Sequence, residues 1–130
     1  MGCFEGLDIC RNSGAFRWIF DAAAGIYTST NDLSKWVIAQ LNHGKYGENN
    51  QNQLFSEAVH KEMWTPQTIL PITGMKPYSC NFKTYGLGWQ LADVNGHLQV
   101  SHTGGLDGIV TQTIMIPDLQ LGIIVLTNQQ

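Results

Sequence analysis

Apolar residues recur at helical spacing in the segment that begins near residue 30. Four of them share one face of a helix: Leu33, Trp36, Val37 and Leu41. Ser29 and Asp32 have the spacing of a capping box, in which the serine hydroxyl accepts a hydrogen bond from the Asp32 N–H and Asp32 reaches back. Gly44 supplies a C-cap. The pattern predicts a helix over residues 30–42.

A second, shorter helix is predicted over residues 56–64. Pro66 ends it, and its apolar face gathers Leu54, Phe55, Val59 and Met63. Between the two helices, residues 44–53 are rich in Asn and Gln, so we expect a surface loop there. Residues 65–84 contain three prolines and show no regular period, which predicts a long irregular loop.

The period changes from residue 85 onward, where polar and apolar positions alternate as they do in strands. Asn95-Gly96 is typical of a two-residue hairpin turn, and Pro117-Asp118 opens a second turn. Four strands are predicted, over residues 85–92, 97–102, 109–116 and 122–127. Consecutive strands joined in this way form an antiparallel β-meander. Because helices precede the meander in the chain, the predicted fold class is α+β.

The first twenty residues follow no clear period and stay an N-terminal segment of uncertain structure, although a short strand at 15–20 fits its aromatic residues. The small residues at 21–25 favour a tight loop. We therefore divide the chain into residues 1–20 and one domain over residues 21–128. That domain has a helical part at 21–64, a loop at 65–84 and a sheet at 85–128.

Composition narrows the class of protein. The chain has 130 residues, of which 43% are hydrophobic, as expected for one globular domain with a modest core. The net charge is −3 and no cluster of Lys or Arg occurs, which argues against a nucleic-acid partner. No apolar run reaches the roughly 18 residues of a membrane span. The three cysteines have no C-x-x-C spacing; a Cys3–Cys10 disulfide is one alternative, and free thiols are favoured.

The candidate chemistry lies at His102-Thr103-Gly104-Gly105, expected where one short strand ends and the next begins. Two glycines let a ligand approach the backbone closely, and their N–H groups can face an oxyanion. His102 can donate to a carboxylate or a carbonyl. Taken alone, these four residues are explained more simply by a tight turn with a half-buried histidine. The four histidines have no metal-ligand spacing, so we expect no metal site.

The order of several short motifs gives these residues more weight. They are Tyr85-Gly86-Leu87-Gly88-Trp89, His102-Thr103-Gly104-Gly105, Asp107-Gly108, Ile116-Pro117-Asp118, Leu121-Gly122 and Leu126-Thr127-Asn128. The ordered set resembles the C-terminal part of the serine β-lactamase and penicillin-binding-protein-like family, which includes class C β-lactamases, D-alanyl-D-alanine peptidases and related esterases. Ala24 to Ser29, followed by Asp32-Leu33, is similar to the small-residue loop and helix of that family. The resemblance covers about residues 21–128.

The resemblance implies a helical part packed on an antiparallel sheet and acyl transfer through a serine ester, without a cofactor. His102-Thr103-Gly104 lies where the family carries Lys-Thr-Gly or His-x-Gly. His102 would shape the field and bond the substrate, and Thr103 would bond a substrate carboxylate or carbonyl. The Gly105 N–H would be the second oxyanion donor. The implied partner is a small-molecule or peptide acyl substrate.

The sequence departs from the family in its nucleophile. It contains no Ser-x-x-Lys; Thr73-Gly-Met-Lys76 has the spacing with the wrong nucleophile. Tyr-x-Asn is also absent, because Tyr46 and Tyr78 each have Asn three residues on. The chain also stops before the family's closing helix. We therefore expect a C-terminal fragment with no catalytic residue of its own, inactive alone.

A different interpretation makes the chain a non-catalytic ligand-binding or self-associating α+β module. In either case we expect a homo-oligomer, formed by strand pairing or by exchange of residues 1–20. A monomer in which residues 1–20 fold back as a strand is the alternative. No signal peptide is recognised, and location is left unassigned, although the family is commonly periplasmic or extracellular.

Overall fold

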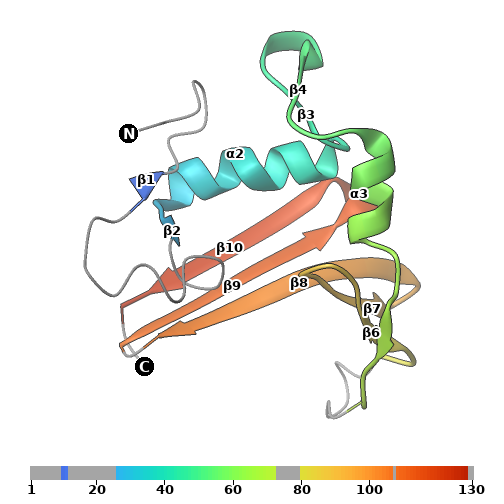
Figure 1. Ribbon diagram of the computed structural model, residues 1–130. Coiled ribbons are helices and arrows are strands. Elements are labelled where there is room, and N and C mark those ends of the chain that lie inside the picture. The colour runs from blue at the N-terminus through green and yellow to red at the C-terminus, as the bar shows by residue number, and fades with distance from the viewer. Residues whose placement is uncertain (1–9, 12–25, 73–79, 107, 129–130) are drawn as a thin grey trace.

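The computed structural model describes residues 10–11, 26–72, 80–106 and 108–128. A six-stranded antiparallel sheet carries one long helix, α2 (Thr30–Leu41), across one face, and α3 (Glu57–Met63) lies beside it at one end (Figure 1). The strands, in spatial order, are β10 (Leu121–Thr127), β9 (Ile109–Ile116), β8 (His97–Leu106), β7 (Gln90–Val94), β6 (Lys83–Tyr85) and β5 (Thr68–Ile69). The predicted α+β meander is confirmed.

Shorter elements connect and flank this sheet. Two small antiparallel pairs are formed by β1 (Cys10–Arg11) with β2 (Ile26–Tyr27), and by β3 (Lys45–Tyr46) with β4 (Asn52–Gln53). Two single-turn 3-10 helices are η1 (Glu48–Asn50) and η2 (Pro117–Leu119). The predicted strand at 15–20, the tight loop at 21–25 and the Cys3–Cys10 alternative lie outside the described residues.

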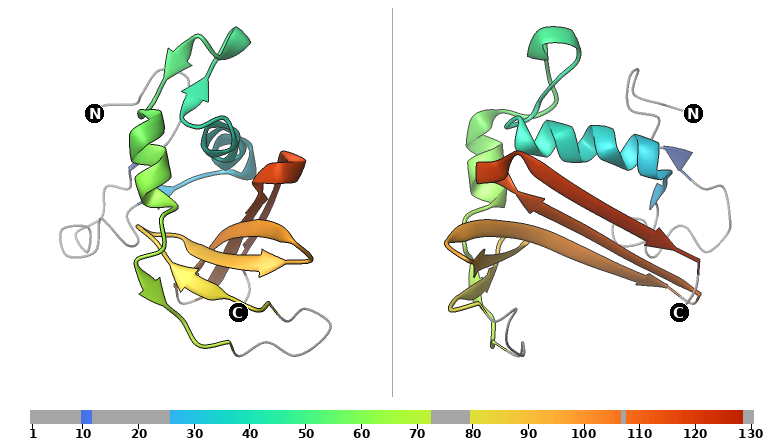
Figure 2. Two further views of the ribbon diagram at one scale, coloured as in Figure 1. Left: turned by 90° about the vertical axis from the view of Figure 1, so that its right-hand side faces the viewer. Right: turned by 180° about the vertical axis from the view of Figure 1, so that it is seen from behind.

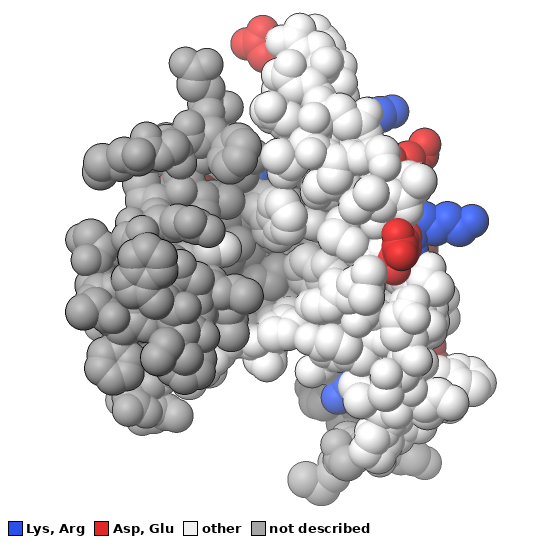
Figure 3. Space-filling view, viewed as in Figure 1, with Lys and Arg blue, Asp and Glu red and all other residues white. Residues whose placement is uncertain are grey.

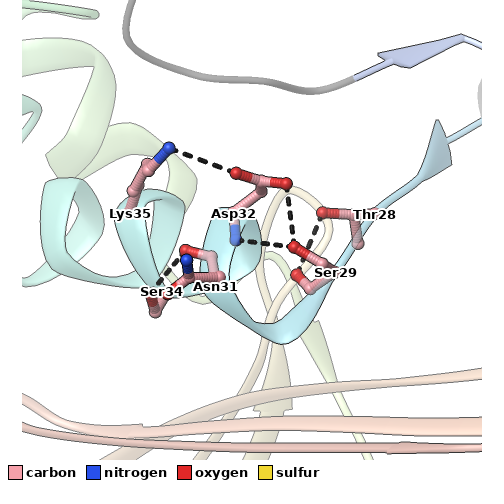
Figure 4. Close-up of polar contacts among 6 residues, drawn as sticks. All are labelled: Thr28, Ser29, Asn31, Asp32, Ser34 and Lys35. Carbon is pink, nitrogen blue, oxygen red and sulfur yellow. Dashed lines mark hydrogen bonds and ion pairs between the residues drawn. The ribbon is translucent and has the colours of Figure 1, made fainter.

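Helix α2 begins where the capping residues place it. Ser29 Oγ accepts a hydrogen bond from the Asp32 N–H at 3.2 Å and donates to Asp32 Oδ2 at 2.8 Å (Figure 4). Lys35 Nζ lies 3.1 Å from Asp32 Oδ1. The Ser29 hydrogen bond, followed by that from Lys35, lowers the pKa of Asp32. The predicted start of the helix is therefore confirmed.

The C-terminal end of α2 differs in one detail from the sequence prediction. His43 takes the left-handed position after the cap residue Asn42, with φ 55°, and Gly44 follows with φ 90°. The His43 N–H donates to the Gln40 carbonyl at 3.1 Å and the Gly44 N–H to the Ala39 carbonyl at 2.7 Å, which is a Schellman motif. A Cβ at Gly44 would also overlap the carbonyl oxygen of Phe55. Gly44 is therefore required to avoid this clash, but the first left-handed residue after the helix is His43 and not the glycine.

The core lies between α2 and one face of the sheet (Figure 2). Across four neighbouring strands, one row of paired residues faces the helix: Leu91, Val100, Met115 and Gly122. Val37 and Leu41 of α2 pack against this row, and Trp89 completes the buried cluster. Gly122 lets the helix approach β10, because a Cβ there would overlap Cγ1 of Val37.

The strand predicted at residues 85–92 is interrupted, and this prediction was wrong in its extent. The chain turns at residues 86–89, where the Gly86 N–H donates to the Trp89 carbonyl at 2.8 Å and Gly88 has φ 82°. The turn packs on the end of α3, because the Leu87 N–H donates to the Met63 carbonyl at 3.0 Å. A Cβ at Gly86 would overlap that same carbonyl.

Helix α3 lies within the predicted range, with Ser56 Oγ accepting from the Val59 N–H at 3.3 Å. The predicted loop at 65–84 instead contains β5 and most of β6, which pair through Thr68 with Tyr85 and through Ile69 with Thr84. A two-residue strand is too short to show a period, which explains the difference. Residues 73–79 of that range are not described.

The hairpin at Asn95-Gly96 is confirmed, with φ of 51° and 84° and Val94 paired to His97. Strand β8 then continues to Leu106, beyond its predicted end at residue 102. The His-Thr-Gly-Gly segment therefore lies inside a strand, where a turn between strands was predicted. Among the described residues, no helix is long and apolar enough to cross a membrane.

The charged side chains of the described residues are dispersed. On the face shown in Figure 3, Lys and Arg do not gather into one patch and lie among Asp and Glu side chains. The described part of this face therefore offers no extended field of a single sign to a charged partner.

Candidate functional site

Among the described residues, the distal half of β8 is paired along one edge only, and its other edge is open. Strand β7 pairs with β8 only as far as Ser101, which lies opposite Gln90. Strand β9 pairs with β8 along its whole remaining length, as far as Leu106 opposite Ile109. Residues 102–106 are all exposed. An unpaired edge presents backbone N–H and C=O groups to an incoming chain or ligand, and at the two glycines no side chain flanks these groups.

The four predicted site residues share this edge but not one face of the sheet. His102 lies opposite Thr113 and Thr103 opposite Gln112, and successive side chains of a strand point to opposite faces. His102 therefore lies on the same face as core residue Val100, the side that carries α2. Thr103 lies on the other face. What the four residues share is therefore the backbone edge of β8.

His102 has a partner from another strand. The Tyr85 hydroxyl and His102 Nε2 are 2.9 Å apart, and the two rings meet edge to face with centroids 6.1 Å apart. The hydroxyl donates when Nε2 carries no proton and accepts when it does, and with either tautomer the contact positions the ring. Tyr85 was not among the predicted site residues. The sequence feature that could have indicated Tyr85 is its position as the first residue of the Tyr-Gly-Leu-Gly-Trp motif.

The two glycines meet different surroundings. A Cβ at Gly104 would lie 2.5 Å from Thr111 Oγ1, so packing within the sheet favours glycine there. A Cβ at Gly105 would have no heavy atom within 4 Å. Packing among the described residues therefore does not require glycine at 105.

Comparison with known proteins agrees with the family resemblance of the motifs. Residues 5–130 match the Beta-lactamase family. The chain belongs to that family. It is also 30% identical, over 115 residues, to the "Unguisins hydrolase ungD" of Aspergillus violaceofuscus (strain CBS 115571). The match covers 82% of this chain and 19% of that relative, so the chain spans about a fifth of the relative's length. The resemblance found from sequence is confirmed at the level of the family.

Serine hydrolases act through an activated serine nucleophile. The described serines of this chain have other structural places. Ser29 and Ser56 cap the two helices, and Ser34 donates to the Asn31 carbonyl at 2.7 Å. Ser101 is buried in the middle of β8. None of these serines lies in a Ser-x-x-Lys sequence. Thr73-Gly-Met-Lys76 falls outside the described residues.

A second polar cluster lies where the end of α2 meets the middle of α3. His43 Nδ1 and His60 Nδ1 are 3.3 Å apart, although 17 residues separate them in sequence. His60 is only 3% exposed. Burial, followed by the neighbouring His43, lowers the pKa of His60, while the Gln40 carbonyl and the Glu57 carboxylate act in the opposite direction. Spacing alone did not reveal this pair, because only the tertiary fold brings the two rings together.

The family match assigns no role to the pair of His43 and His60. Over the described part of the chain, no group of three or more His, Cys, Asp or Glu side chains is arranged to hold a metal ion. His97 is placed differently again, at the surface, with Nδ1 3.2 Å from Asp118 Oδ2.

Proposed function

We propose that this chain forms the substrate-lining strand of a serine hydrolase of the Beta-lactamase family that acts on an acyl substrate. The observation that carries the proposal is the exposed edge of β8 at residues 102–106, which no described strand pairs with on that side, together with the contact between His102 and Tyr85. Family membership supports the reaction class, and the relative that it matches is named as a hydrolase.

The proposed roles follow from the chemistry of the edge. The Gly105 N–H donates to the oxyanion that forms when an acyl carbonyl is attacked. The Thr103 hydroxyl bonds a carboxylate or carbonyl of the substrate, and His102 binds the substrate and sets the local field. An extended peptide or acyl chain aligns along the strand as an added edge strand.

The nucleophile is proposed to come from outside these 130 residues. Ser-x-x-Lys and Tyr-x-Asn are both absent from the sequence. The chain also matches only 19% of its relative. We propose that the chain by itself is inactive, and that an adjoining segment supplies the serine and its base.

Substrate binding is tested by nuclear magnetic resonance on the isolated chain. A benzylpenicillin titration is expected to shift the backbone amides of residues 102–106 and to leave residues 97–101, on the same strand, unchanged. Thr103→Val is expected to weaken binding, whereas Thr68→Val, an exposed threonine on β5, leaves it unchanged. Shifts spread evenly over the sheet, or none at millimolar probe, would overturn the role of the edge.

Inactivity is tested with a chromogenic cephalosporin and a p-nitrophenyl ester. We expect no turnover above the rate in buffer, because loss of a catalytic nucleophile typically costs several powers of ten in rate. Turnover abolished by a serine-directed phosphonate would show a nucleophile within the chain. An in-frame Ser-x-x-Lys and Tyr-x-Asn encoded upstream would support the hydrolase over a non-catalytic binding module, and their absence there would favour the module.

A further inference from the structure

Helix α3 is anchored to the rest of the molecule through a titratable side chain. Of its 7 residues, only His60 is buried. Its Nδ1 lies 3.3 Å from Nδ1 of His43, just beyond the end of α2. We propose that this histidine pair is a pH-sensitive latch, which holds α3 on the end of α2 near neutral pH and on acidification releases α3 and, through it, Tyr85. The last step, from Tyr85 to substrate binding, rests on the proposed function.

The hydrogen bond between the two rings exists only while at least one of the two Nδ1 atoms is unprotonated. In the neutral pair, one Nδ1 donates its proton and the other accepts it. An imidazole that is protonated on both nitrogens can only donate. Protonation of the accepting ring therefore breaks the bond between His43 and His60.

The surroundings of His60 oppose its charged form. The ring stacks on Phe55 with an interplanar angle of 4° and lies against Trp64 with ring centroids 4.1 Å apart. Among the described residues, His60 Nε2 is buried without a hydrogen-bond partner, so a proton added there would be left unsatisfied. Burial, followed by the neighbouring His43, lowers the pKa of His60.

The polar and charged groups beside the pair come from both helices. The Gln40 carbonyl of α2 and the Glu57 carboxylate of α3 act to raise the pKa of His60, but burial and His43 outweigh them. Glu57 and Lys61 line a cavity of about 650 Å³ that both histidines also line. A displacement of α3 would therefore expose His60 to water on the cavity side and allow it to take up a proton.

Linkage between proton binding and release sets the pH range of the latch. His60 stays neutral while α3 is held, and it titrates near the ordinary histidine pKa of about 6.5 once α3 is released. Below that pH the released state binds more protons than the latched state, so the stability of the latch is present above about pH 6.5 and is lost as the pH falls toward the lowered pKa of the latched state. A helix as short as α3 has little stability of its own, so it depends on this packing.

The turn at residues 86–89 connects α3 to the substrate edge. The Met63 carbonyl, in the last turn of α3, accepts from the Leu87 N–H at 3.0 Å. Tyr85 is the last residue of β6 and directly precedes this turn. Its hydroxyl lies 2.9 Å from His102 Nε2. Release of α3 therefore removes a support of the turn, and with it the fixed position of Tyr85 beside His102.

Amide hydrogen exchange of the full chain at pH 7.5 and pH 5.5 tests the latch. Rates divided by the intrinsic exchange rates give protection factors. The reporters are the Trp64 N–H, which donates to the His60 carbonyl, and the Leu87 N–H. The amides of β9 report on the whole fold. In the wild type we expect acidification to lower the protection of the two reporters about five- to tenfold relative to β9, because release is coupled to the uptake of one proton near pH 6.5.

Two variants that do not titrate should remove this response. His60→Phe keeps an aromatic ring between Phe55 and Trp64, and His60→Gln does without the larger ring. In both, we expect the protection of the reporters relative to β9 to change by less than about twofold over the same pH range. The matched control, His97→Asn, removes a surface histidine and should respond as the wild type does. An equal response in the wild type and both His60 variants would rule out the latch, and so would a parallel loss of protection in β9.

Benzylpenicillin titration at the two pH values tests the step to the substrate edge separately. His102 titrates in the wild type and in His60→Phe alike, so the difference between these two proteins isolates the latch. We expect acidification to weaken binding about two- to fivefold more in the wild type than in His60→Phe. Equal weakening would reject the coupling to the edge. Absence of binding at both pH values would reject the proposed function, whereas the latch is decided by the exchange measurements.

Discussion

The side chains of His102 and Tyr85 meet next to the start of β7, where its pairing with β8 stops at Gln90. The hydroxyl of Tyr85 lies 2.9 Å from His102 Nε2, and β6 ends at Tyr85. The turn at residues 86–89 follows directly, so the position of Tyr85 depends on where that turn packs against α3. The orientation of a site residue is thus coupled to the helical part of the molecule.

Tyr85→Phe should release His102 without disturbing the fold. The change removes one partly exposed hydrogen bond, which contributes about 1 kcal/mol or less. We expect the tautomer ratio of His102, read from its ¹⁵N shifts, to change while the amide spectrum of β9 stays the same. Tyr46→Phe, on β3, is the control. An unaltered His102 in Tyr85→Phe would contradict a positioning role for the hydroxyl.

The N-terminal cap of α2 allows a test at a single residue. Ser29→Ala removes the hydroxyl that accepts from the Asp32 N–H, and loss of such a cap typically costs about 1 kcal/mol. Thr30 is the first residue of the helix, so Thr30→Ala is expected to cost less. Urea unfolding midpoints compare the two. A more damaging Thr30→Ala would place the cap one residue later.

The hydrogen bonds of the Asp93 carboxylate predict that the stability of the protein depends on pH. Its Oδ1 accepts from the backbone N–H groups of Phe82 and Asn81 at 2.6 and 2.7 Å, and its Oδ2 accepts from Asn81 Nδ2 at 2.9 Å. The hydrogen bond from Phe82 is the largest cause that lowers the pKa of Asp93. A carboxyl group whose pKa is lower in the folded than in the unfolded protein stabilises the fold at any pH above its unfolded-state pKa. This stabilisation is lost as the pH falls through the folded-state pKa.

Replacing Asp93 by asparagine should flatten that dependence. The amide side chain of the Asp93→Asn variant keeps a carbonyl acceptor but does not titrate. We expect the free energy of unfolding of the wild type to fall more steeply below about pH 4 than that of Asp93→Asn. Urea unfolding at a series of pH values measures it. Parallel curves for the two proteins would argue against the hydrogen-bonded carboxylate as a source of stability.

At the scale of elements, the contact between α2 and β10 rests on a glycine. A Cβ at Gly122 would overlap Cγ1 of Val37, whereas one at Gly105 meets no heavy atom within 4 Å. We expect Gly122→Ala to destabilise the protein by about 1–3 kcal/mol, because overpacking forces the helix away. Gly105→Ala, also within a strand, should change stability by less than about 1 kcal/mol. Similar unfolding midpoints for Gly122→Ala and Gly105→Ala would show that α2 moves away from β10 at little energetic cost.

Elements with local signals could be predicted from the sequence. The cap at Ser29 and the Asn95-Gly96 turn depend on hydrogen bonds and dihedral angles within a few residues, and both were predicted correctly. The break after Tyr85 could not be predicted, because it depends on a carbonyl of α3. The same limit applies to the site. Its motif marked the residues of β8, but the open edge and the Tyr85 contact arise only when β6, β7 and β8 pair.

At the scale of the whole molecule, β10 stands at the end of the six-stranded sheet. Helix α2 packs against β10 on one face. On the opposite face Ile123 and Val125 are 44% and 47% exposed. An apolar edge strand is a template for pairing with another chain. We therefore propose that the homo-oligomer expected from the sequence is a symmetric dimer paired through β10.

Sedimentation equilibrium at micromolar concentration tests the dimer. We expect a mass twice that of the 14.4 kDa chain. Val125→Lys places a charge on β10 and is expected to give monomer, because lysine on an edge strand opposes strand pairing. Val59→Lys alters another exposed valine, on α3, and should leave the dimer intact. A single wild-type species of 14.4 kDa would reject pairing through β10. Dissociation by both lysine variants alike would indicate a general effect of charge, because only one of the two lies on the edge strand.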